Sequence, residues 1–400
     1  MVFEVRAAGS EVVPWKSNSR GNKGDRTLTQ ISTRVPAFIA DLELPNLGQL
    51  EVLVQEALAA VARFDVSCER LGIGVSPLLV RTESVASSRF EELNSSEMNF
   101  LRATVGQKLS EDAVAMAAGL ESLRFVVENT RPHCDLNLDL LLSAHEILMR
   151  RDSLDSEFAG VVRTFQNWIE GNAKSPLGAT YIPPVPERVR PLLDDLFKFV
   201  NRTDVNPLVL AAIGHAQFEA IHPFADGNGR IGRALITAIL RKFDLTRIAV
   251  VPLAAALTAD RTSYIAGISS YLEGDATQII TVISQGLKVA SETGRGVVTQ
   301  LADLPNSWLQ ALGPRADSSI ERVLNLLIAT NTITAPEVSQ SLGVTLKTAL
   351  TAINALEQNN ILQEITGRKR DRHWVAPEVI DLLGYYADDT AERMRQLKKS

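Results

Sequence analysis

The sequence predicts a mainly α-helical protein with a small β-hairpin flap and a C-terminal winged helix-turn-helix domain. Apolar residues recur three and four positions apart through most of the 400-residue chain, which is the spacing of an amphipathic helix. One stretch, 171–186, is instead rich in Gly, Pro and Tyr-Ile and favours an extended flap. Near the C-terminus, three helical segments precede two short apolar runs around a basic loop, which is the order of a winged helix.

Most of the expected helices lie ahead of that domain, and Asn, Asp, Gly or Pro marks their ends. They cover 47–67, 76–97, 110–129, 135–150, 186–201, 206–221 and the run that follows residue 233. Residues 9–35 are rich in Ser, Gly, Asn and charge without periodicity, so they are interpreted as a loose leader. Residues 294–315 contain Gly-Arg-Gly, Pro305 and Gly313-Pro314 and are interpreted as a linker.

The C-terminal domain is expected to contain helices over 317–330, from near Thr334, and over 345–360, with a turn at Gly343. Its wing would carry four cations, Arg368, Lys369, Arg370 and Arg372. Winged helices bind DNA or serve as protein contacts. The helix expected to read DNA offers one cation for phosphates, Lys347, so both functions stay open.

Composition excludes several classes of protein. Lys and Arg number 41 against 47 Asp and Glu, and the formal charge of −6 provides no overall cationic field for nucleic acid or an anionic membrane. Cys68 and Cys134 cannot form a zinc site by themselves and are read as reduced thiols. The longest apolar run, 248–257, contains a proline and is shorter than the roughly 20 residues that span a bilayer. We therefore expect a cytoplasmic protein without a membrane partner.

The densest set of functional residue types is HPFADGNGRIGR at 222–233. Gly227-x-Gly229-x-x-Gly232 matches the dinucleotide-binding pattern in form, but a helical segment precedes it where that pattern needs a strand. Gly227, Asn228 and Gly229 would instead turn backbone amides inward at the start of a helix, where they favour phosphate. Arg230 and Arg233 lie near one face of that helix and indicate a polyanion.

Two further residues of this segment indicate chemistry at a phosphate. Asp226 would be repelled by phosphate unless a divalent cation lies between them, which is the usual arrangement for magnesium. His222, at the end of the preceding helix, has the proton affinity of a general base. The segment resembles the signature of the Fic family, His-Pro-Phe-x-Asp/Glu-Gly-Asn-Gly-Arg-x-x-Arg, at every specified position.

The resemblance implies a Fic-type helical core that transfers AMP from ATP to a hydroxyl group of a target protein or of the enzyme itself. It implies that His222 is the general base and that Asp226 holds Mg²⁺ between the α- and β-phosphates. Residues 227–229 would form the anion hole, Arg230 would support the phosphates, and Arg233 would reach the γ-phosphate. It also implies that Thr180, Tyr181 and Ile182 in the flap clamp the target as an added strand.

The resemblance covers roughly 80–290. The domains are accordingly expected at 1–110, with a leader and an inhibitory helix, at 111–298, with the catalytic core, and at 299–400, with the winged helix. Ser87-x-x-x-Glu91 resembles the inhibitory Ser/Thr-x-x-x-Glu-Gly/Asn motif of the family. Glu91 would then pair with Arg233 in place of the γ-phosphate. Glu92 departs from the motif, which carries Gly or Asn at that position.

Two other functions fit the same residues. The pocket could remove AMP from a modified target, with Glu91 positioning a water molecule. The protein could also be a nucleotide-responsive regulator that binds DNA through its winged helix. ATP and an unknown target protein are the expected partners, and the sequence leaves open whether the chain forms a homodimer.

Overall fold

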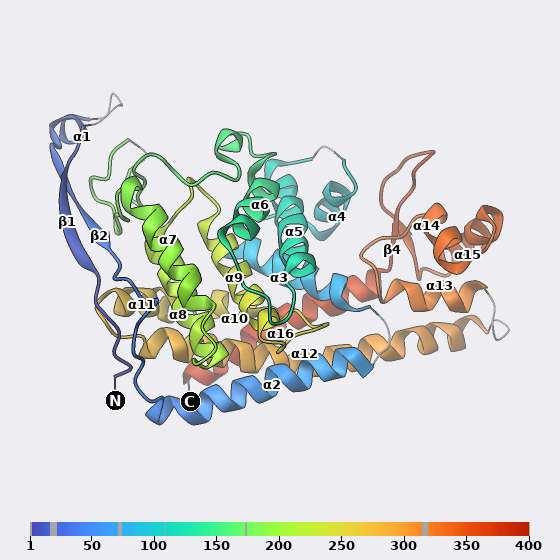
Figure 1. The fold of residues 1–400 in the computed structure, drawn as a ribbon. Coiled ribbons are helices and arrows are strands. Elements are labelled where there is room, and N and C mark those ends of the chain that lie inside the picture. The colour runs from blue at the N-terminus through green and yellow to red at the C-terminus, as the bar shows by residue number, and fades with distance from the viewer. Residues whose placement is uncertain are drawn as a thin grey trace. The chain divides into compact units, whose positions relative to one another are not determined.

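Helices form most of the chain, as the periodicity predicts, in a computed structural model that describes residues 2–16, 22–70, 74–107, 109–172, 174–313 and 319–399 (Figure 1). The chain divides into two units, and each unit is assembled from three separate stretches of sequence. The first contains Met1–Val54, Val126–Phe243 and Arg261–Ser284, and the second contains Gln55–Phe125, Asp244–Asp260 and Gln285–Ser400. Within the described residues, no helix combines the length and the apolar character needed to cross a membrane.

The first unit is built around a buried helix. Its longer helices include α6 (Leu138–Met149), α7 (Pro186–Val200), α8 (Pro207–Ile221), α9 (Asn228–Lys242), α11 (Arg261–Leu272) and the start of α12 (Thr277–Leu312). Nearly every residue of α8 is buried, and α7, α9 and α11 pack against it. The contact with α9 depends on Gly232, because a Cβ there would collide with Glu219 and lie 3.1 Å from Phe218 Cδ1. The α8–α9 pair therefore holds the two ends of the 222–228 loop at close range.

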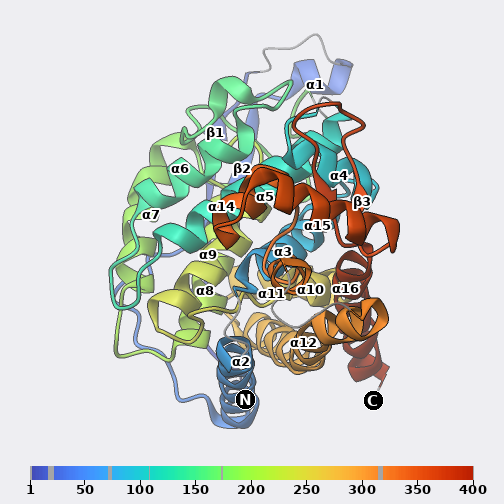
Figure 2. The same cartoon turned by 90° about the vertical axis from the view of Figure 1, so that its right-hand side faces the viewer.

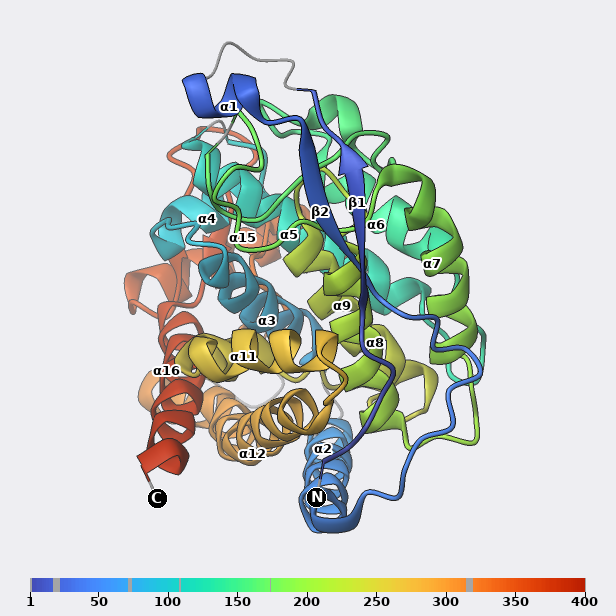
Figure 3. The same ribbon diagram turned by 90° about the vertical axis from the view of Figure 1, so that its left-hand side faces the viewer.

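The expectation of a loose leader is wrong for the described part of 9–35. Strand β1 (Gly9–Pro14) pairs antiparallel with β2 (Gln30–Val35), and the short helix α1 (Lys23–Thr27) lies between them in the chain (Figure 3). Asn22 and Asp25 form a capping box that starts α1. The strands carry few apolar residues, so their order comes from packing within the first unit rather than from a hydrophobic pattern.

The second unit contains most of α2 (Glu51–Arg70), α5 (Glu111–Asn129) and α12, and all of α3 (Ser76–Phe90), α4 (Glu97–Thr104) and α10 (Leu253–Ala259). The helix expected over 76–97 is shorter than predicted: α3 ends at Phe90, before Glu92, whose backbone is left-handed (φ 63°), and α4 begins only at Glu97. The linker expected over 294–315 is also wrong in its described part, since α12 continues through Pro305 to Leu312. Its buried apolar residues keep helical spacing across the proline: Val297, Val298, Leu301, Leu304 and Trp308.

The end of the chain has the predicted order of three helices and a hairpin. We call residues 319–376 the C-terminal module: α13 (Ser319–Leu327), α14 (Ala335–Leu342), α15 (Leu346–Gln358), β3 (Gln363–Glu364) and β4 (Trp374–Val375) (Figure 2). Thr334 and Glu337 form a capping box at the start of α14, and Gly343 ends it with φ 62°. A long helix that the sequence analysis did not predict, α16 (Pro377–Lys399), follows the module.

Candidate active site

His222 ends α8 in a conformation that few residues other than glycine adopt. Its backbone lies in the left-handed region (φ 49°, ψ 62°), and its N–H donates to the Phe218 carbonyl at 3.0 Å. Residues with a strained backbone persist only where the surrounding structure holds them, and they cluster at functional sites. The chain therefore leaves α8 sharply at the half-buried histidine and enters the loop that leads to α9.

Gly227 precedes α9, and two features of this position require glycine. Its φ of 76° is left-handed, and a Cβ would lie 2.9 Å from Leu148 Cδ2 and 3.3 Å from Met149 Sδ. No side chain caps the start of α9. The amides of its first turn have no partner within the helix, and they lie at the positive end of the helix dipole. This is the arrangement that binds phosphate.

The side chain of Asn228 stabilises the 222–228 loop through hydrogen bonds to its backbone. Its Oδ1 accepts from the Phe224 N–H at 2.8 Å, and its Nδ2 donates to the Phe224 carbonyl at 3.0 Å. Phe224 is fully buried. The side chain of Asn228, expected in the anion hole, is thus engaged with the loop backbone, which leaves its backbone amide for an anion.

His145, on α6, holds the same loop and was not singled out from the sequence. Its ring stacks on Phe224 with centroids 3.8 Å apart. The Gly160 N–H donates to its Nδ1 at 2.9 Å, so Nε2 carries the proton and donates to the Asp226 carbonyl at 3.0 Å. Burial lowers the pKa of His145 to about 4, which keeps this neutral form. The sequence shows only an isolated histidine in an apolar helix.

Arg163 is the second residue that the sequence analysis missed. It is buried, and its guanidinium donates to the carbonyls of His222 at 2.8 Å, Phe165 at 3.1 Å and Pro184 at 2.6 Å. Its own N–H donates to the Pro223 carbonyl at 2.9 Å. Burial lowers the pKa of Arg163 to about 10, so the side chain stays cationic at neutral pH. One arginine thus joins the histidine backbone to Pro184 in the flap and to Phe165, which precedes the flap.

The charged residues of the motif lie on and beside the first two turns of α9. Asp226 is exposed and pairs with Arg230 at 3.2 Å, while the Arg230 side chain is only 11% exposed. Arg233 is buried on the same helix. Among the described residues, no group of three or more His, Cys, Asp or Glu side chains could hold a metal ion. A single carboxylate such as Asp226 is compatible with Mg²⁺, which is commonly held by one or two carboxylates together with substrate phosphates.

The expected flap residues are largely engaged within the first unit. The Tyr181 hydroxyl donates to the Ala220 carbonyl on α8 at 2.6 Å, so this ring anchors the flap instead of reaching outward. Ile169 forms an isolated antiparallel bridge with Tyr181, and the Arg34 N–H of β2 donates to the Ile182 carbonyl at 2.8 Å. The flap is therefore a short bridged loop rather than a regular hairpin.

The connection between β1 and β2 contacts the flap region at a second point. Asp25 is buried and accepts from Ser175 Oγ at 2.5 Å and from Asn172 Nδ2 at 2.9 Å. Trp15 packs edge-on against Trp168 with centroids 5.7 Å apart. The residues before β2 thus help to shape the flap, a role that no local sequence signal indicates.

The two residues of the expected inhibitory motif lie in the second unit, whereas 222–233 lies in the first. Ser87 is buried in α3, and Glu91 is an exposed residue at the C-terminal cap of that helix. Glu92 has the left-handed backbone that Gly or Asn adopts more easily.

Comparisons with known proteins agree with the motif. The Fic/DOC family model matches residues 135–240. A probable protein adenylyltransferase of Aquifex aeolicus (strain VF5) is 34% identical over 113 residues, which cover 28% of this chain and 32% of that protein. Protein adenylyltransferase fic-1 of Caenorhabditis elegans is 23% identical over 216 residues, which cover 53% of this chain and 39% of that protein. The chain thus spans between 32% and 39% of the length of these two relatives.

The crystal structure of a Fic family protein from Desulfovibrio desulfuricans G20 is similar to this chain with a TM-score of 0.52 and 21% identity. The match covers 82% of this chain and 95% of that one. This likeness shows that the two chains share a fold.

Proposed function

Residues 135–240 carry a Fic/DOC family domain, and on this premise we propose that the protein transfers AMP from ATP to a hydroxyl group of a protein, itself included. The observation that carries the proposal is the 222–228 loop. This loop joins His222, at the end of α8, to Gly227, whose left-handed backbone precedes α9. No side chain caps this helix start, so the backbone amides of its first turn favour a phosphate.

In this reaction the hydroxyl oxygen attacks the α-phosphorus of ATP, the bond from that phosphorus to the pyrophosphate oxygen breaks, and pyrophosphate leaves. His222 takes the hydroxyl proton. Arg163 and His145 do not touch the reacting atoms but position the loop through the carbonyls of His222 and Asp226. Such positioning matters because phosphoryl transfer depends on orientation and charge neutralisation more than on covalent catalysis.

The charge of the triphosphate would be met by α9. The amides of residues 227–229 would bind phosphate oxygens, Arg230 would support them, and Arg233 would reach the γ-phosphate. Asp226 would hold Mg²⁺, which would neutralise part of the negative charge of the phosphates.

We also propose that Glu91 restrains this activity, as the family motif implies. Two observations support the assignment. Glu91 is an exposed residue at the end of α3, and Glu92 after it adopts the backbone conformation for which the motif uses Gly or Asn. A helix end of this shape is what the motif specifies, although the residue at position 92 differs.

Labelled ATP and Mg²⁺ test both proposals on the full-length protein. We expect Glu91→Gly to raise self-modification by about tenfold or more, which is within the usual range of coupling between sites. His222→Ala should abolish the transfer, alone or combined with Glu91→Gly, while nucleotide binding is retained. Glu92→Gly is the matched control, because it makes the same change one residue away and should release no activity.

Each result has a different consequence. Transfer that persists in His222→Ala would show that another group is the base. A Glu91→Gly protein as inactive as its parent, although folded and able to bind ATP, would contradict the restraint. Activation by Glu92→Gly equal to that by Glu91→Gly would show that loosening the turn matters and that the Glu91 carboxylate does not.

A further inference from the structure

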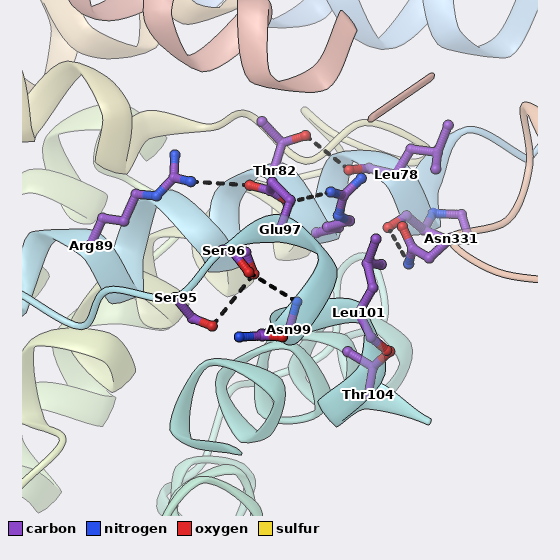
Figure 4. Close-up of polar contacts among 12 residues, drawn as sticks. Leu78, Thr82, Arg89, Ser95, Ser96, Glu97, Asn99, Leu101, Thr104 and Asn331 are labelled. Atoms are coloured by element: carbon purple, nitrogen blue, oxygen red, sulfur yellow. Dashed lines mark hydrogen bonds and ion pairs between the residues drawn. The ribbon is translucent and has the colours of Figure 1, made fainter. Parts of the chain in front are cut away.

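The turn that carries Glu91 is closed by an ion pair across its two ends. Arg89 lies near the end of α3, and its Nη2 donates to Glu97 Oε1 at the start of α4 at 3.0 Å (Figure 4). The other carboxylate oxygen of Glu97 accepts from Arg81 at 2.5 Å. One carboxylate thus bridges two turns of α3 to α4 and encloses residues 90–96 between its contacts.

The burial of Arg81 makes the loss of its ion pair with Glu97 energetically costly. Its side chain is 4% exposed, whereas that of Glu97 is 31% exposed. A buried guanidinium that loses its carboxylate keeps its desolvation penalty without the compensating attraction. Loss of the Glu97 charge is therefore expected to separate α3 from α4 rather than to leave both helices in place.

The turn itself is tied at further points within the second unit. The Leu93 N–H donates to the Ser88 carbonyl at 3.2 Å, which closes the end of α3. The Asn94 N–H donates to Asp112 of α5 at 2.9 Å, and its side-chain amide donates to the Glu92 carbonyl at 2.8 Å. The position of Glu91 is thus set by the helices around it.

The C-terminal module supplies part of the support beneath this turn. Arg102 of α4 donates to the Ile365 carbonyl at 2.6 Å, and Gln107 donates to the Thr366 carbonyl at 2.8 Å. A single buried cluster joins α3, α4 and α5 to the hairpin and to α16. Its residues are Val85, Phe100, Leu101, Met116, Ile365, Val375 and Ile380, with Leu93 and Met98 packed against them.

From these contacts we propose that Glu97 is a positioning residue for the inhibitory Glu91, and that the hairpin of the C-terminal module regulates the restraint by supporting α4. The inference rests on the proposed function of Glu91. The physical reason is that Glu91 lies in a turn whose two ends are joined by Glu97, and Glu97 belongs to a helix that is bonded to Ile365. A change in the hairpin would loosen the turn through α4.

Full-length variants test this with labelled ATP, using self-modification as the first readout and hydrogen exchange of residues 88–94 as the second. Glu97→Gln removes the charge and keeps the size of the side chain, and Arg102→Ala removes the bond to the hairpin. Glu392→Gln is the matched control, because it breaks an exposed pair with Arg395 in the same unit.

We expect Glu97→Gln to raise self-modification about 5-fold and Arg102→Ala to raise it less, with faster exchange at 88–94 in both. Glu392→Gln should change neither readout. Glu91→Gly combined with Glu97→Gln should be no more active than Glu91→Gly alone, because both changes release the same restraint. If Glu97→Gln unfolds, Arg89→Gln replaces it, since this change opens the turn and leaves Arg81 paired.

The outcomes separate this inference from the proposed function. If Glu91→Gly is active and Glu97→Gln and Arg102→Ala behave like the parent protein, the positioning role is wrong. If Glu91→Gly gains nothing, the restraint itself fails. Exchange at 88–94 then still decides whether Glu97 and the hairpin hold the turn, and unchanged exchange in both variants would overturn that claim as well.

Discussion

Replacing Gly227 with alanine should cost stability through two separate effects. The left-handed backbone (φ 76°) costs an L-residue ~1–2 kcal/mol. The new Cβ would lie 2.9 Å from Leu148 Cδ2 in a packed interior, and overpacking of this kind costs ~1–3 kcal/mol. Alanine regains ~0.4–1 kcal/mol by restricting the unfolded chain. Together these three effects give a net expected loss of about 1–4.6 kcal/mol.

Gly178→Ala provides the matched control. Gly178 has a similar φ of 80°, but a Cβ there would meet nothing within 4 Å. The control should therefore show the backbone cost alone, and the difference between the variants, about 1–3 kcal/mol, should measure packing. Thermal unfolding followed by calorimetry should place Gly227→Ala below Gly178→Ala by about 1 °C for each kcal/mol of that difference, because the unfolding entropy grows with chain length. Equal midpoints for the two variants would refute the packing argument.

Three further predictions concern the loop and the restraint. Glu92→Gly should raise the thermal midpoint, because the strain relieved, ~1–2 kcal/mol, exceeds the entropy cost of glycine, ~0.5–1 kcal/mol, and a lower midpoint would count against this. Arg163→Lys should lower kcat for AMP transfer about 10- to 100-fold with nucleotide affinity retained, since lysine cannot hold His222 and the flap together; an unchanged kcat would exclude that role. Stability should fall as the pH drops from about 6.5 towards 4, because the unfolded chain takes up a proton that the buried His145, with its pKa of about 4, resists. The free energy of unfolding, measured with denaturant, should depend less steeply on pH in His145→Gln over this range, by up to about 1.4 kcal/mol per pH unit. An unaltered pH profile would contradict the assignment.

The motif loop could be predicted because its function depends on consecutive residues. A histidine, an aspartate and two glycines within eight residues predict a helix end and a helix start, wherever the rest of the chain lies. Arg163 and His145 could not be found in the same way. Each reaches the loop from another part of the first unit, and a single arginine or histidine carries no spacing that distinguishes it from a surface residue.

The errors in the fold have similar causes. The end of α3 was missed because Glu92 adopts a left-handed backbone that the sequence would signal only through Gly or Asn. The leader appeared irregular because Asp25 and the strand pair are ordered by distant partners such as Ser175. Helix α12 passes Pro305 because buried apolar residues on both sides outweigh the lost hydrogen bond. In each case tertiary contacts override a local preference.

The interleaved construction of the two units bears on how the protein is made. A ribosome releases the chain from its N-terminus at roughly 5–20 residues per second, and many domains fold as soon as they emerge. Here the first unit needs Arg261–Ser284 and the second needs residues up to the C-terminus. Neither unit can therefore be completed early in translation, and apolar helix faces stay without their later partners until those stretches have been made.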